Sequence, residues 1–259
     1  MELGLKGRKA IVCASSRGLG RACARSLARE GVAVVVNGRD PAALEKTAAE
    51  LRAETGAEIT PVVADLNVQA ERERLVAARP DADILVNNNA GPPPGSFQDW
   101  GHAEWLAALE SNLLAPVLLI RALLPGMRER RFGRIVNITS AMVKAPVSPM
   151  GLSTAARSGL TAVCKALSKE VAADNVTINN LLPERLDTDR QVQMAELVSK
   201  FRGISYEEAR AEQARSIAAG RLGRPEELGD ACAFLCSEQA GYISGQNLQL
   251  DGGSYPGLL

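Results

Sequence analysis

The chain has little that points to a metal or to an anionic macromolecule. Its 259 residues include a single histidine and 3% aromatic side chains, and the 30 basic and 30 acidic residues cancel. Partners such as nucleic acid or an anionic membrane require a basic surplus gathered on one face. We therefore expect no nucleic-acid partner and no membrane partner.

Cysteine usage and the amino terminus indicate a reducing compartment. The five cysteines include no Cys-x-x-Cys spacing, and no long apolar run resembles a signal peptide, so we expect a cytoplasmic protein. Cys232 and Cys236 share a helical face, but without other soft ligands or clustered histidines we expect core-filling thiols and no metal site. The longest apolar stretch, Leu113 to Leu124, contains Pro116 and Arg121 and is too short to span a bilayer.

Short β-branched runs alternate with helical patterns along the whole chain, without a linker, so we expect one domain over residues 1–259. The strands are nearly all apolar, as burial on both faces requires. The sequence predicts an α/β, Rossmann-like, doubly wound fold whose parallel seven-stranded sheet carries helices on both faces. The predicted strands are Lys9–Cys13, Val32–Asn37, Glu58–Ala64, Ile84–Asn87, Arg134–Thr139, Val176–Leu181 and Gln246–Leu250.

The first predicted strand runs into a glycine-rich turn, Ala14-Ser15-Ser16-Arg17-Gly18-Leu19-Gly20, and then into a helical pattern. Such a turn aims backbone N–H groups and the positive end of a helix at a pyrophosphate. Gly18 and Gly20 permit close approach of the backbone. The order of strand, turn and helix predicts a dinucleotide site.

The second predicted strand ends in Asn37, Gly38 and Arg39, without the carboxylate that binds the ribose hydroxyls in NAD-selective sites. Arg17 and Arg39 offer two guanidinium groups for a 2′-phosphate, which favours NADP(H) over NAD(H). The carboxylate of Asp40, one residue further, keeps NAD(H) open, and in that case both arginines are solvated charges.

Several later motifs follow one another in a recognisable order. Asn88-Asn89-Ala90-Gly91 follows the fourth strand, Ser140 ends the fifth, and Ser153 lies four residues before Arg157. With the glycine-rich turn, they resemble the short-chain dehydrogenase/reductase family, and in particular 3-oxoacyl-acyl-carrier-protein reductases, over nearly the whole chain. The resemblance implies an oxidoreductase that acts on a ketone or secondary alcohol, with a small-molecule substrate that includes acyl thioesters among its candidates.

The resemblance also assigns site residues. In the family, a serine orients the carbonyl, a tyrosine four residues before a lysine exchanges a proton with its oxygen, and an asparagine holds a water linked to the lysine. The corresponding catalytic positions are Asn112, Ser140, Ser153 and Arg157. The corresponding cofactor positions are Ala14, Ser16, Arg17, Gly18, Leu19, Gly20, Asn37, Arg39, Asp65, Leu66, Asn89, Ala90, Gly91, Arg157, Pro183 and Thr188.

The chain departs from the family pattern at the residues closest to the chemistry. Ser153 and Arg157 replace the tyrosine and the lysine, Ala14 replaces the first glycine of the turn, and Glu184 replaces the glycine of the Pro-Gly-x-x-x-Thr loop. An aliphatic alcohol is a far weaker acid than a phenol, and arginine does not carry protons in proteins. We therefore expect Ser153 to stabilise negative charge better than it donates a proton.

Because Ser153 is a poor proton donor, other groups are candidates for that role. Lys144, in the loop after Ser140, is the candidate surrogate donor, with a solvated charge as the plainer interpretation. His102 is expected at a helix start, in surface or cap packing. Gly151-Leu152-Ser153 faintly resembles a hydrolase nucleophile elbow, but Ala155 replaces its second glycine.

Two hypotheses on function stay open. The first is the NADP(H)-dependent oxidoreductase with an altered acid, and the second is a catalytically weak or inactive nucleotide-binding protein with a regulatory or oligomer-partner role. By resemblance, residues 189–219 form a substrate cover, although a surface helix pair without ligand contact fits the same pattern. Resemblance also implies a homodimer or homotetramer on the helices around Asn112 and Arg157, with Ala155, Ala156 and Gly159 permitting close packing.

Overall fold

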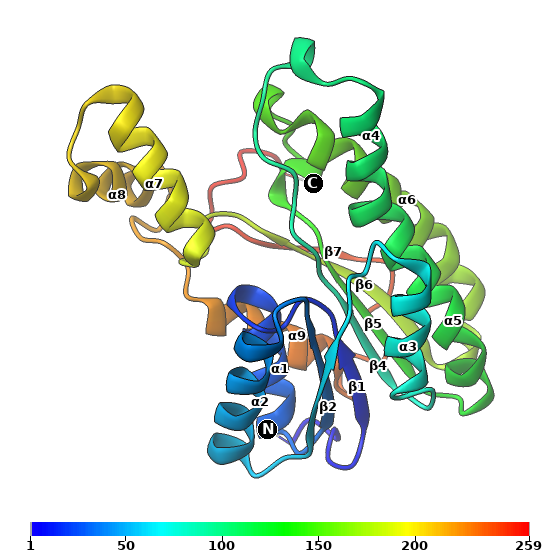
Figure 1. Cartoon of the computed structure of the whole chain (residues 1–259). Helices are drawn as coiled ribbons and strands as arrows, with labels where there is room; N and C mark the ends of the chain where they lie inside the picture. Colours follow the sequence, from blue (N-terminus) through cyan, green and yellow to red (C-terminus); the bar gives the residue numbers. More distant parts are fainter. Residues whose placement is uncertain (1, 259) are drawn as a thin grey trace.

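A computed structural model describes residues 2–258, and its centre is a parallel sheet of seven strands in the order β3-β2-β1-β4-β5-β6-β7 (Figure 1). This confirms the predicted Rossmann-like fold. The chain reverses its direction of growth between β1 and β4, and ligands of such sheets bind beyond the carboxyl ends of the strands at that point. The strands are β1 Lys9–Val12, β2 Ala33–Gly38, β3 Ile59–Val63, β4 Ile84–Asn87, β5 Gly133–Ile138, β6 Val176–Pro183 and β7 Asn247–Leu250.

Helices cover both faces of the sheet and bury two apolar clusters against it. Successive residues of a strand point to opposite faces, so Ala10 and Val12 enter one cluster while Ile11 enters the other. One face carries α1 Gly18–Arg29, α2 Pro41–Thr55 and α9 Pro225–Cys236. The other carries α3 Gln69–Ala77, α5 Ala115–Glu129 and α6 Gly151–Val171.

The two helices of the expected cover, α7 Asp189–Arg202 and α8 Tyr206–Arg215, pack chiefly on each other. Figure 1 shows them standing apart from the helices that cover the sheet, on the side of its carboxyl edge. The carboxyl-terminal tail ends near the amino-terminal part of α6 in the same view. These segments therefore frame the edge at which a ligand would bind.

The strands are less apolar than the sequence pattern indicated, because an asparagine ladder crosses four of them. In-register pairing sets Asn87 beside Asn137, Asn137 beside Asn180, and Asn180 beside Asn247. Their side-chain amides form a chain, with each Nδ2 donating to the next Oδ1 at 2.9, 2.9 and 2.8 Å. The ladder satisfies polar groups that burial would otherwise leave unpaired.

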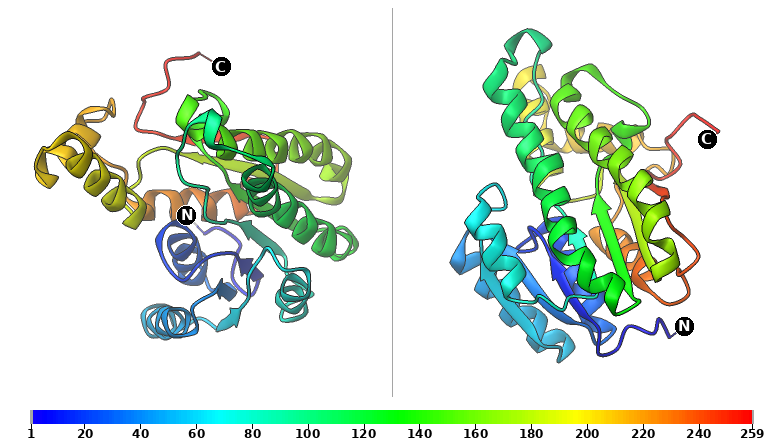
Figure 2. Two further views of the ribbon diagram at one scale, coloured as in Figure 1. Left: turned by 45° about the horizontal axis from the view of Figure 1, so that its top comes forward. Right: turned by 90° about the vertical axis from the view of Figure 1, so that its right-hand side faces the viewer.

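The apolar stretch around Leu113 belongs to a longer helix than expected. Figure 2 (right) shows α4 His102–Leu109 continuing into α5, and a π-helical turn, Glu110–Leu114, joins the two. The combined helix of 28 residues, His102–Glu129, is long and apolar enough to cross a membrane by length and composition. In the folded protein, 39% of the most apolar 18-residue segment of this helix is buried. Core helices of soluble proteins can be equally long and apolar.

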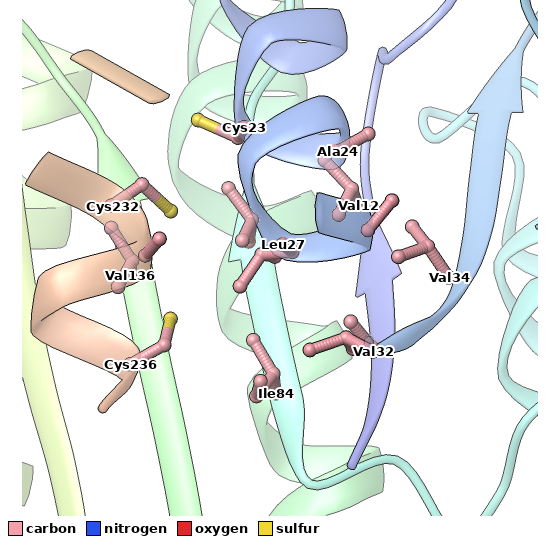
Figure 3. Packing of buried hydrophobic residues seen from close by; sticks show 14 of the residues in the cluster. Val12, Cys23, Ala24, Leu27, Val32, Val34, Ile84, Val136, Cys232 and Cys236 are labelled. Carbon is pink, nitrogen blue, oxygen red and sulfur yellow. The ribbon is translucent and has the colours of Figure 1, made fainter. Parts of the chain in front are cut away.

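Three cysteines fill the interface between α1 and α9. Figure 3 shows the sulfur atoms of Cys23, Cys232 and Cys236 in the gap between these helices, and all three residues are fully buried. Hydrogen bonding to Cys23, together with burial, holds the pKa of the Cys232 thiol well above its usual range. The predicted core-filling role of Cys232 and Cys236 is confirmed.

Candidate functional site

The glycine-rich turn lies where β1 meets α1, at the point where the sheet changes direction. Ala14 adopts a left-handed backbone with φ 44°, and its N–H donates to Asn37 Oδ1 at 3.1 Å. A Cβ at Gly20 would lie 2.3 Å from the carbonyl oxygen of Ala14, so only glycine fits there. The alanine that replaces the family's first glycine thus keeps the glycine conformation, at a cost of about 1 kcal/mol.

The start of α1 can receive a phosphate group. Its first N–H groups have no acceptor within the helix, and Gly18 opens the turn with φ 58°. Thr47 Oγ1 donates to the Ser16 carbonyl oxygen at 2.7 Å and fixes the turn from α2, while Leu19 packs against the core. These free amides at a helix N-terminus fit a pyrophosphate.

The end of β2 is built without a carboxylate facing the turn. Asn37 is buried, and its Nδ2 donates to the carbonyl oxygens of Val62 and Ala64, so this side chain ties strands together. Asp40 is the N-cap of α2, where its Oδ1 accepts from Ala42 and Ala43. The carboxylate that kept NAD(H) open is therefore committed to a helix cap.

The two arginines chosen for a 2′-phosphate are exposed, and each faces a carboxylate. Arg17 Nη1 lies 3.6 Å from Asp189 Oδ2, and Arg39 Nη1 lies 3.7 Å from Asp65 Oδ2. They do not contact each other. Exposed ion pairs at these distances are weak, so both guanidinium groups can turn to a phosphate at little cost.

Of the two predicted cofactor positions after β3, Asp65 has an accessible side chain and Leu66 a buried one. Asp65 is a third exposed and accepts from the backbone N–H of Asn67. Leu66 is only 5% exposed and packs in the core under α3. A ligand can therefore meet Leu66 only through its backbone.

A π turn anchors the loop that follows β4. Asn112 lies inside this turn and donates from Nδ2 to the Ala90 carbonyl oxygen at 3.3 Å, while Asn89 Nδ2 donates back to the Ser111 carbonyl oxygen. The Oδ1 of Asn112 is buried and accepts no hydrogen bond from residues 2–258. Asn88, which the site prediction omitted, joins this loop to the glycine-rich turn by donating to the Ala14 carbonyl oxygen.

Arg157 is buried at the carboxyl edge and bonds to the ends of two strands. It is 8% exposed, and its Nη1 donates to the carbonyl oxygens of Ile138 and Thr139 while Nη2 donates to Asn89. Desolvation, together with the charge of Arg190, lowers the pKa of Arg157 to about 10. It is therefore a cation at neutral pH, held by carbonyl dipoles.

Ser153 is a side-chain hydrogen-bond partner of this cation. Its Oγ accepts a hydrogen bond from Arg157 Nε at 3.1 Å, which leaves the hydroxyl proton available to a ligand. Ser140 lies two residues beyond the end of β5, and its Oγ accepts from the N–H of Met142, so its hydroxyl proton is also available. A hydroxyl donor such as Ser153, bonded to a fixed positive charge, can stabilise a developing oxyanion.

The Pro-x-x-x-x-Thr loop carries Glu184 where the family pattern has glycine. Pro183 ends β6, and the next positive φ falls on Arg185, at 50°. Glu184 lines a pocket of about 330 Å³ beside β7 with residues such as Gln249 and Asp251, and its Oε1 lies 3.8 Å from Arg185 Nε. Thr188 caps the start of α7 and makes no side-chain capping bond.

The remaining candidates lie away from the serines. Lys144 Nζ donates to Gln249 Oε1 at 3.3 Å and lies 5.3 Å from the ring centre of Tyr255. These two contacts hold the ammonium group on the side of β7. His102 is the exposed first residue of α4, the surface position that was predicted.

Two neighbours of the site were missed by the sequence prediction. Arg190 Nη2 donates to the Pro92 carbonyl oxygen at 3.4 Å, on the loop that also holds Gly91. Trp100 packs against Gly151, at the start of the helix that carries Ser153. Arg190 follows Thr188 by two residues, and that proximity was the available signal.

Comparisons with known proteins agree with this geometry. The family model described as enoyl-(acyl carrier protein) reductase matches residues 13–255. The 3-oxoacyl-(acyl-carrier-protein) reductase of Haemophilus influenzae is 32% identical over 97% of this chain and 99% of its own length. L-Sorbose reductase from Gluconobacter frateurii, solved with NADPH and L-sorbose, superposes with a TM-score of 0.95 at 29% identity and full coverage of both chains. An actinorhodin polyketide ketoreductase solved with NADPH gives 0.90 at 32% identity, covering 95% of this chain and 97% of its own.

Proposed function

Because the chain belongs to the short-chain dehydrogenase/reductase family, we propose that it is an NADP(H)-dependent oxidoreductase that interconverts a ketone and a secondary alcohol. The observation that carries the proposal is the hydrogen bond from the buried cation Arg157 to Ser153, on an arginine that also binds the carbonyl oxygen of Thr139, the residue before Ser140. These groups lie at the carboxyl edge of the sheet, beyond the free amides at the start of α1.

NADP(H) is the cofactor that the residues fit. Asp40 is occupied as a helix cap, whereas Arg17 and Arg39 are exposed and held only by long ion pairs. Gly38 adds space at this position, because a Cβ there would lie 3.1 Å from Ser16. The NADPH complexes of L-sorbose reductase and the polyketide ketoreductase support the same choice.

The chemistry divides between the cofactor and these side chains. When bound, NADPH supplies the hydride that reduces the carbonyl carbon. Ser140 and Ser153 donate hydrogen bonds to the carbonyl oxygen, and Arg157 stabilises its growing negative charge through Ser153. Since neither serine nor arginine gives up a proton near neutrality, the proton that completes the alcohol comes from water. Loss of a positioned acid costs about 10²–10⁴ in rate, so we expect slow turnover.

The surroundings of the site complete the proposal. Helices α7 and α8 cover the substrate, and Asn112 holds a water through its otherwise unpaired Oδ1. An apolar groove of about 320 Å³ between α5 and α6 forms a homodimer or homotetramer interface in the cytoplasm. The groove is lined by Val117, Ile120, Arg121, Leu124, Pro125, Arg128, Val163 and Leu167.

A second function is favoured by one observation. Arg157 donates four hydrogen bonds to atoms of residues 2–258, an arrangement that also suits a structural cation in a nucleotide-binding protein without turnover. Such a protein would act as a regulator or as a partner in mixed oligomers.

One experiment separates the two functions. NADPH and NADH binding is measured first, and cofactor absorbance is then followed with a panel of 3-oxoacyl thioesters, ketones and alcohols. Turnover that falls in Ser153→Ala and Ser140→Ala, with unchanged NADPH affinity, supports the oxidoreductase. Tight NADPH binding without consumption across the panel supports the binding protein.

A further inference from the structure

Two arginines at the proposed substrate site have no carboxylate partner. Neither Arg157 nor Arg190 forms an ion pair with any of residues 2–258. Of the two acidic residues that flank Arg190, Asp187 is held by Arg210 at 2.7 Å, and Asp189 lies 3.6 Å from Arg17 and forms no ion pair with Arg190. In a chain whose charges balance overall, positive charge is left over at this place.

The two cations face the same short loop. Arg157 Nη2 donates to the carbonyl oxygen of Asn89, and Arg190 Nη2 donates to that of Pro92, three residues further on. They are close enough for the charge of Arg190 to lower the pKa of Arg157. Like charges held together without a counterion are unfavourable, and an anion bound between them would relieve the repulsion.

Gly91 lies close to the side chains of Arg157 and Ser153. A Cβ at Gly91 would lie 3.4 Å from Arg157 Nη2 and 3.6 Å from Ser153 Oγ, so a side chain here would cover two groups that are only 8% and 6% exposed. The guanidinium of Arg157 also carries one N–H donor more than its hydrogen bonds use. An anionic group that enters here lies beside the hydroxyl assigned to the reacting oxygen.

We propose that the substrate is a ketone that carries a carboxylate, and that Arg190, with Arg157 behind it, binds this carboxylate. This inference rests on the proposed function and names the substrate class of the same site. An arginine pairs with a carboxylate through two parallel N–H···O bonds, a geometry that also orients the substrate. The phosphates of the cofactor carry the same charge, so the test must distinguish the two anions.

The kinetic test compares acids with their methyl esters. The intact protein is assayed with NADPH and a series of 2-oxo, 3-oxo and 4-oxo acids, each beside its ester. For at least one pair, we expect a KM for the acid at least tenfold below that of its ester. Arg190→Gln should raise the KM of the acid about tenfold, change that of the ester less than twofold, and leave the Kd of NADPH unchanged. Lys169→Gln, an exposed lysine at the carboxyl end of α6 that forms no ion pair with residues 2–258, is the control and should change none of these.

A binding test works without turnover. Calorimetry titrates the corresponding saturated acids and their esters into the protein, with and without NADP⁺. Binding of an acid but not of its ester, lost in Arg190→Gln, supports the inference even if no ketone is reduced, in which case only the proposed function fails. Equal binding of acid and ester overturns it. A weaker NADPH affinity of Arg190→Gln with unchanged acid binding also overturns it and assigns Arg190 to a cofactor phosphate.

Discussion

Arg157 Nε donates a hydrogen bond to Ser153 Oγ at 3.1 Å, one helical turn apart on α6. In the family that this chain resembles, the same turn joins a tyrosine acid to a lysine. The exchange replaces a titrating pair with a hydroxyl backed by a permanent charge. The consequences for rate, pH dependence and stability can each be measured.

Removal of the Ser153 hydroxyl tests its role at the carbonyl oxygen. Ser153→Ala should lower kcat by about 10²-fold, the usual cost of one donor to an oxyanion, with little change in NADPH affinity. Steady-state kinetics and calorimetry measure the two effects. The matched control is Ser158→Ala, a partly exposed serine of the same helix. An unchanged kcat in Ser153→Ala would remove this serine from the mechanism.

Restoration of the family pair tests the weakened acid. Ser153→Tyr combined with Arg157→Lys should raise kcat by up to about 10²-fold, because a positioned acid again supplies the proton. The comparison requires that NADPH binding and thermal unfolding of the double variant match the wild type. A sharp fall in kcat in a folded, NADPH-binding variant would contradict the account.

The pH dependence of turnover follows from the same exchange. Between about pH 6 and 9, kcat of the wild type should be flat, because Arg157 keeps its charge below its pKa of about 10 and Ser153 does not titrate there. The Ser153→Tyr, Arg157→Lys variant should gain a pH-dependent limb. A wild-type profile with a clear step near neutrality would indicate another titrating acid, of which Lys144 is the first to test.

The left-handed backbone of Ala14 predicts a stabilising substitution. Ala14→Gly should raise the free energy of unfolding by about 0.5–1 kcal/mol, because relief of φ strain exceeds the added entropy of the unfolded chain. Chemical denaturation measures this value. Ala49→Gly, on the exposed face of α2, should have the opposite sign and lose about 1 kcal/mol. Destabilisation by both substitutions would show that Ala14 is unstrained.

The asparagine ladder should be a major contributor to stability. Asn137→Leu leaves Asn87 Nδ2 and Asn180 Oδ1 buried without partners, so the free energy of unfolding should fall by about 2–4 kcal/mol. The exposed Asn67 provides the control, because Asn67→Ala should change it by less than about 0.5 kcal/mol. Equal effects in the two variants would mean that the ladder adds nothing.

The cap of α9 predicts a pH-dependent stability. Glu227 accepts hydrogen bonds from the Arg221 guanidinium and the Arg224 backbone, which lower its pKa from 4.5 to about 2. A folded-state pKa below the unfolded value gives stability that is present above about pH 4.5 and lost as the pH falls through 2. Glu227→Gln should therefore lower Tm at pH 7 and have a much smaller effect at pH 2, where about half of the carboxylate is protonated. A Tm difference as large at pH 2 as at pH 7 would exclude this ionisation as its source.

The fold could be predicted because burial on both faces leaves a clear record in the sequence. Runs such as Ile84–Asn87 and the turn at Gly18 and Gly20 identify the strands and the switch point without reference to distant contacts. Most predicted strand limits differ from those in the structure by one or two residues, because side-chain composition does not mark where a ladder of hydrogen bonds ends. The in-register ladder around Asn137 depends on strand order and lies beyond local patterns.

The site could be predicted less completely, for physical reasons that differ by residue. The spacing of Ser153 and Arg157 gave their proximity on one helix face, but not the carbonyl oxygens of Ile138, Thr139 and Asn89 that hold the arginine. These partners lie at the ends of two strands, β4 and β5. Arg190 was missed for the same reason, because its neighbour Pro92 is distant in sequence.

The central claim is that the crossover from β1 to β2 binds NADP(H) beside an altered catalytic pair. Calorimetric titration of the folded protein with NADPH and with NADH tests it most directly. The account predicts binding of NADPH at least about tenfold tighter than that of NADH, with the difference reduced in Arg39→Ala. No heat from either coenzyme, in a protein that unfolds cooperatively, would contradict it.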